Sequence, residues 1–202
     1  LAFLMSWLMK LSLVVLKAGN IGDLEIAQFA AALEIACFIL IIAKSTNKFY
    51  QPELALIMSS ADWIHFNHLK QQRLALIGVA CIAFFVVVLI FGRQILGWFG
   101  DEFVPGYIAL CFMSAGTCTA TAFSMAPEYL KFADRLKTIL LVNCAAGILL
   151  IVLTWVLAKS HGVSGAGFAF GLVLILAAIA FRVLALRQHA IEIGSTVTKR
   201  SV

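Results

Sequence analysis

The sequence predicts an all-α integral membrane protein, built as a bundle of six transmembrane helices. Hydrophobic residues make up 63% of the 202 residues, and only 12% are charged. This charged share is about half of what soluble domains carry. Apolar residues also gather in six long runs, and Lys and Arg concentrate in alternate connections. A soluble core of this length cannot remove so much apolar surface from water, whereas lipid solvates it directly.

Each of the six apolar runs predicts one membrane-spanning helix. Most runs have about 18 to 22 residues, enough for a helix to cross a hydrocarbon core of roughly 30 Å. They lack the strict alternation of a transmembrane strand. Backbone groups in lipid must bond within their own segment, which also favours helices. The predicted spans lie near residues 1–16, 26–43, 74–92, 106–125, 138–158 and 165–186.

The long connection after the second run predicts a further helix, near residues 53–70, lying at the membrane interface. Pro52 and Glu53 suit the first turn of a helix. Such a helix either couples two spans or anchors a surface loop, and the second interpretation is favoured. Its apolar residues recur at helical spacing: Leu54, Ile57, Met58, Ala61 and Ile64.

The distribution of Lys and Arg predicts the orientation. If residues 17–25 lie outside, then residues 44–73, residues 126–137 and the chain from Arg182 lie inside. The outside set holds three cations and the inside set eleven, so the C-terminus and the tail, residues 187–202, are predicted to be cytoplasmic. The outside cations are Lys17, Arg93 and Lys159. The inside cations are Lys44, Lys48, Lys70, Arg73, Lys131, Arg135, Lys137, Arg182, Arg187, Lys199 and Arg200.

No motif in the sequence points to catalysis, a cofactor or a metal. It has no phosphate-binding glycine loop, no nucleophile elbow and no zinc-protease motif. The five cysteines lie in apolar runs without CxxC spacing, and His65 and His68 lack a third ligand. The net charge of +5 follows from the cytoplasmic connections, and no basic run or aromatic platform indicates nucleic acid. We therefore predict a protein that is not an enzyme, with no cofactor, metal or nucleic-acid partner.

Two charges inside predicted spans are the strongest candidate functional residues. Lys10 lies within the first span, and Glu34 lies near the middle of the second. A charge at that depth costs about 3 kcal/mol on insertion scales. Counted from the turn at Ile21 and Gly22, the two lie at nearly equal depth, so a helical hairpin would let them pair. The pair either serves function or fixes helix packing, and function is slightly favoured. Lys17 shares a helix face with Lys10 and joins the candidate substrate-binding set.

The fourth span carries a stripe of hydroxyl groups. Ser114, Thr117 and Thr121 share one helix face and complete the candidate substrate-binding set. The stripe either packs against another helix or lines a polar cavity, and both interpretations stay open.

Two further features of the last span have structural interpretations. Gly167 and Gly171 form a GxxxG pair, which permits close helix approach. Arg182 and Arg187 lie near its inner end, where extending to the lipid headgroups accounts for both.

Three stretches resemble the polysaccharide and O-antigen flippases of the multidrug/oligosaccharidyl-lipid/polysaccharide exporter superfamily. They are AGNIGDLEIAQFAAALEIACFI from residue 18, ILGWFGDEFVPGYIALCFMSAG from residue 95, and NCAAGILLIVLTWVLAKSHGVSGAGFAFGL from residue 143. The resemblance covers nearly all of residues 10–186. The chain departs from the family pattern at Ala27 and Phe29, where Gly and Tyr are usual, and at Ala126 and Pro127, where small glycine-containing sequence is usual.

The resemblance implies the C-terminal half of a transporter with twelve or more helices, whose N-terminal half is missing from this chain. The initial Leu1, in place of Met, likewise leads us to expect a sequence that starts partway through a longer protein. The implied function is the transport of an undecaprenyl-diphosphate-linked oligosaccharide across the cell inner (cytoplasmic) membrane. This step serves lipopolysaccharide, O-antigen or exopolysaccharide synthesis, and it proceeds by alternating access.

Lys10 suits the anionic substrate that the resemblance implies. Two alternatives stay open. One is a cation-coupled multidrug exporter of the same superfamily, in which Glu34 carries the ion. The other is a non-transporting membrane scaffold subunit. Under each of them membrane lipid surrounds the chain.

Overall fold

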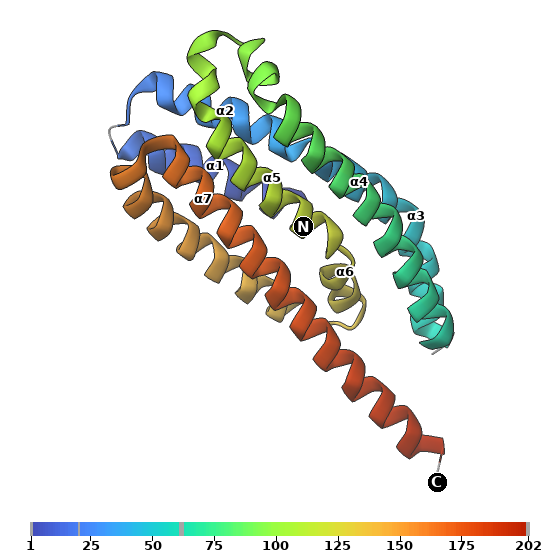
Figure 1. The fold of residues 1–202 in the computed structure, drawn as a ribbon. Coiled ribbons are helices and arrows are strands. Elements are labelled where there is room, and N and C mark those ends of the chain that lie inside the picture. The colour runs from blue at the N-terminus through green and yellow to red at the C-terminus, as the bar shows by residue number, and fades with distance from the viewer. Residues whose placement is uncertain (1, 20, 61–62, 201–202) are drawn as a thin grey trace.

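A computed structural model describes residues 2–19, 21–60 and 63–200, and it is all-helical over these ranges (Figure 1). This confirms the predicted all-α class. The helices are α1 (Ala2–Ala18), α2 (Asp23–Cys37), α3 (Ile39–Ser60), α4 (Trp63–Gly97), the 3₁₀ helix η1 (Asp101–Gly106), α5 (Tyr107–Ala122), α6 (Met125–Phe132) and α7 (Leu136–Arg200).

Four helical segments among the described residues are long and apolar enough to cross a membrane. They are Asp23–Glu53, His68–Gly97, Asp101–Phe132 and Leu136–Gln188. The last has 53 residues, more than twice what one crossing needs. At Gly162 the backbone leaves the helical region, with φ 57° and ψ −140°, and Figure 1 shows the chain doubling back. Glycine adopts a positive φ without steric cost. The segment α7 therefore consists of two arms, and the predicted boundary between residues 158 and 165 coincides with a reversal of the chain.

Helix α5 lies at the centre of the bundle and contacts α2, α3, α4 and α7. Its contact with the second arm of α7 is close because both helices present glycine. A Cβ atom added to Gly116 would lie 2.6 Å from the Cα atom of Gly171. One added to Gly167 would lie 2.5 Å from the Cα atom of Ala109. The packing role predicted for Gly167 and Gly171 is confirmed.

The outer surface of α4 is apolar along most of its length. The side chains of Val79, Ile82 and Ile90 are 69%, 68% and 64% exposed. Removing one such side chain from water stabilises a protein by about 1.5–3 kcal/mol. This surface is therefore suited to contact with lipid or with another apolar protein surface. Trp98 follows the last residue of α4 and is 83% exposed, as expected of an aromatic residue at a membrane interface.

The interfacial helix is predicted near residues 53–70, a stretch that the end of α3 and the start of α4 occupy on either side of residues 61–62. Helix α3 continues through Pro52 to Ser60, and α4 begins at Trp63, so this stretch belongs to two long helices. Proline in a helix frees the carbonyl group four residues earlier. That carbonyl belongs to Lys48, which is exposed, so polar surroundings can satisfy it. The side chains of all five residues of the predicted apolar face lie outside the described part of the structure.

Candidate functional site

The hydroxyl groups of the stripe on α5 lie in different surroundings: Thr117 packs against α2, whereas Thr121 lines a cavity. Thr117 is fully buried and donates a hydrogen bond of 2.8 Å to the carbonyl oxygen of Ala36. Ala36 lies next to the last residue of α2, where the chain changes from α2 to α3. Ser114 and Thr121 are also fully buried, and their hydroxyl groups have no hydrogen-bond partner within the described ranges. Of the three, Thr121 lines a cavity.

Replacing Thr117 by valine is expected to lower the free energy of unfolding by about 1–3 kcal/mol, because the Ala36 carbonyl loses its buried donor. Thermal unfolding in detergent measures this. The matched control is Thr119→Val. The Thr119 hydroxyl donates at 2.8 Å to Ala115 of its own helix and is less buried, so a smaller loss is expected. Equal losses in the two variants would contradict the packing role.

The larger cavity has a volume of about 430 Å³ and lies between α3, the α5–α6 junction and the second arm of α7. Among the described residues, one carboxylate and two ammonium groups line it, and the Oε2 atom of Glu128 is buried without a hydrogen-bond partner. Amide and hydroxyl groups supply both donors and acceptors, which suits a polar solute such as a sugar. Its polar lining residues are Lys44, Asn47, Lys48, Gln51, Thr121, Ser124, Glu128 and Asn143.

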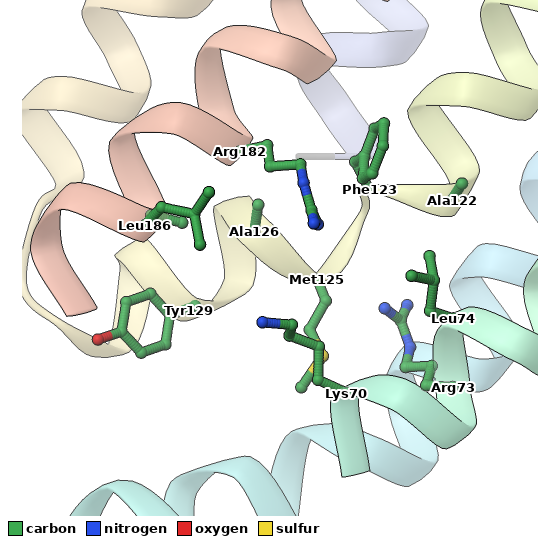
Figure 2. Close-up of a pocket in the computed structure, with 11 residues that line it drawn as sticks. Lys70, Arg73, Leu74, Ala122, Phe123, Met125, Ala126, Tyr129, Arg182 and Leu186 are labelled. Atoms are coloured by element: carbon green, nitrogen blue, oxygen red, sulfur yellow. The ribbon is translucent and has the colours of Figure 1, made fainter. Parts of the chain in front are cut away.

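A smaller cavity of about 60 Å³ lies between α4, the α5–α6 junction and the second arm of α7. Figure 2 shows Lys70, Arg73 and Arg182 around the same space. Arg73 is only 2% exposed, and it also connects this space with the larger cavity. Its guanidinium group donates to the Oδ1 atom of Asn47 and, at 3.0 Å, to the hydroxyl oxygen of Ser124, both of which line the larger cavity.

The structure does not bring Lys10, Lys17 and Glu34 into either cavity. All three are exposed, the lysines on α1 and the glutamate on α2. No ion pair joins Lys10 to Glu34 in the part of the chain that the structure describes. Lys10 lies eight residues before the end of α1, and Glu34 eleven after the start of α2. At about 1.5 Å per residue, both lie roughly 12–16 Å along helices that begin or end at the same turn.

The sequence analysis places Lys44 and Lys48 in a connection between spans and not on a helix. It therefore does not predict most of the residues that line the larger cavity. On a continuous helix, Lys44, Asn47, Lys48 and Gln51 occupy positions i, i+3, i+4 and i+7 and share one face. This spacing was the available signal.

Arg182 also has a role beyond the predicted extension to the headgroups. Its guanidinium carbon lies 4.9 Å from the centroid of the Phe123 ring, and the side chain lines the smaller cavity.

Comparisons with protein families, with curated proteins and with solved structures give no match to this chain. The resemblance to flippases therefore stays a prediction from the residues quoted above.

Proposed function

We propose that this chain is the C-terminal half of a transporter that moves an undecaprenyl-diphosphate-linked oligosaccharide across the cytoplasmic membrane by alternating access. The observation that supports this best is the position of Lys10 and Glu34. Both are exposed, part-way along two apolar helices that meet at one turn, and no ion pair within the described residues joins them.

Two such charges are expensive to place against lipid. Each costs about 3 kcal/mol at the centre of a membrane-spanning helix. Charges of this kind face a bundle interior or a water-filled path in membrane proteins. The surface of α1 and α2 that carries them is therefore suited to cover by a second bundle. A missing N-terminal half would supply that cover and form a central cavity, about which the two halves rock.

The cations favour an anionic substrate. A lysine ammonium is a compact charge with three donors, which holds a phosphate without fixing its geometry. The lining of the larger cavity has two positive charges, on Lys44 and Lys48, and one negative charge, on Glu128. It also has amide groups, which can form hydrogen bonds with sugar hydroxyls. In this proposal Lys10 attracts the diphosphate and Lys17 is an outer waypoint.

The test is complementation of a strain that lacks the transporter. Lys10→Gln is expected to insert at normal protein levels and to reduce surface polysaccharide by at least about tenfold, since it removes a charge-assisted contact. Lys10→Arg is expected to keep part of the activity, because it keeps the charge. The matched control is Lys159→Gln, an exposed cation that stacks on Trp155, with the ammonium 4.3 Å from the ring centroid. Full export by well-expressed Lys10→Gln would reject the phosphate role.

One observation supports the cation-coupled exporter as a second candidate. Glu128 lines a cavity large enough for a hydrated ion, and its Oε2 atom is buried without a hydrogen-bond partner among the described residues, whereas Glu34 lines neither cavity. If this candidate is right, Glu128→Gln abolishes cation-dependent export in vesicles and Glu34→Gln leaves it unchanged. A non-transporting scaffold has no use for a polar cavity of about 430 Å³, and this observation weighs against it.

A further inference from the structure

Three cations line the smaller cavity, and no carboxylate is among the described residues that line it. Its lining comprises Lys70, Arg73 and Arg182, a tyrosine, and otherwise apolar residues. Buried cations are normally paired, because an unpaired charge loses its hydration and gains nothing in return. This lining therefore has the charge and the partial burial of an anion site.

Arg73 and Arg182 have neutral partners. The guanidinium group of Arg73 donates to Asn47 and Ser124, and its Nε atom is buried without a partner among the described residues. Arg182 lies over the Phe123 ring. The carboxylate that acts electrostatically on Arg73 is that of Glu128, which lines the larger cavity and forms no ion pair with Arg73 in the described part of the chain. Both arginines thus keep capacity for a charged acceptor.

The depth of the cavity matches that of a lipid headgroup. Arg182 is 20 residues beyond the reversal at Gly162. At about 1.5 Å per residue this is roughly 30 Å, the thickness of a hydrocarbon core. Leu186 lines the cavity and is 48% exposed, and exposed apolar side chains lie nearby in the sequence of α4 and α7: Leu76 is 56% exposed and Val183 43%. A ligand with a phosphate and hydrocarbon chains would fit both features.

We propose that this cavity binds the phosphate group of an anionic phospholipid such as phosphatidylglycerol. Arg73 and Arg182 donate to the phosphate oxygens, Lys70 adds charge at the same opening, and the acyl chains lie along the apolar surface of α4 and α7. Guanidinium groups bind phosphate oxygens strongly, and basic pockets between membrane helices hold anionic headgroups. The proposal concerns a resident lipid, and it holds whether or not the chain transports an oligosaccharide.

The full chain is purified in neutral detergent and titrated separately with phosphatidylglycerol, phosphatidylcholine and inorganic phosphate. Native mass spectrometry measures retained lipid, and thermal unfolding measures stabilisation. We expect phosphatidylglycerol to be retained and to raise the unfolding midpoint, while phosphatidylcholine has little effect. Arg182→Gln is expected to weaken retention roughly tenfold, and Arg182→Lys to preserve most of it.

Arg187→Gln is the matched control, since this exposed arginine lies on the same helix and does not line the cavity. It should retain phosphatidylglycerol as the parent chain does. Lys70→Gln supplies a second variant if Arg182→Gln fails to fold, and it should also weaken retention. Equal retention by the parent chain and a folded cavity variant would overturn the proposal. Stabilisation by inorganic phosphate equal to that by phosphatidylglycerol would overturn its lipid part.

Discussion

Replacing Gly171 by alanine is expected to lower the free energy of unfolding by about 3 kcal/mol or more, a large share of the roughly 5–15 kcal/mol that stabilises a folded domain. The added Cβ atom would lie 2.3 Å from the carbonyl oxygen of Phe112 and 2.9 Å from its carbonyl carbon. Both are backbone atoms of α5, so no side-chain rotation relieves the overlap. Helix α5 would have to move away from α7, and it also contacts α2, α3 and α4. The substitution is therefore expected to disturb the contacts of α5 with all four helices, and not only its contact with α7.

The matched control is Gly78→Ala on α4, where an added Cβ atom meets nothing within 4 Å. Alanine has the higher helix propensity, so this variant should be as stable as the parent chain or more stable by about 0.5–1 kcal/mol. Size-exclusion chromatography and thermal unfolding in detergent measure both variants. A Gly171→Ala chain as stable as the Gly78→Ala chain would show that α5 and α7 do not pack as described.

The helices were predictable from the apolar runs, but their ends were not. An apolar run shows which residues are compatible with the hydrocarbon core. A helix, in contrast, continues as long as its backbone hydrogen bonds are formed, even through polar residues. Residues Lys44–Gln51 are polar enough to look like a connection, yet their spacing continues the amphipathic face of α3. Pro52 looks like a helix start, but α3 passes through it because the freed carbonyl lies at an exposed position.

The candidate site was predictable only in part, because position along a helix does not fix rotation about its axis. Residue counting places Lys10 and Glu34 at similar depth, but pairing also requires that both side chains face the contact between α1 and α2. Both side chains are instead exposed. In the same way, the spacing of Thr117 and Thr121 places both on the same face of α5. Only the packing shows that α2 covers the first, while a cavity opens beside the second.

The orientation of the bundle predicts a strong difference in chemical labelling. In the described part of the chain, Lys44, Arg73 and Arg182 line cavities that residues of α6 also line. Lys17 lies in the last turn of α1, and Lys159 lies three residues before the reversal at Gly162. Eleven cations against three predict that the first group lies on the cytoplasmic side. Ser45 and Ser160 are both exposed and mark the two predicted sides.

A cysteine at position 160 is expected to react fully with a membrane-impermeant thiol reagent in intact cells, because Ser160 is close to the turn at Gly162, which is predicted to be external. A cysteine at position 45 is expected to react only after the cells are permeabilised, because it follows Lys44 at the end that is predicted to be cytoplasmic. The five native cysteines all lie within the apolar helices, so the parent chain should give little labelling and serves as the control. Gel quantification of the labelled fraction before and after permeabilisation measures each site. Labelling of position 45 but not position 160 in intact cells would reverse the orientation. It would then place the cationic cavities at the outer leaflet, away from the anionic lipids of the cytoplasmic leaflet that attract basic clusters.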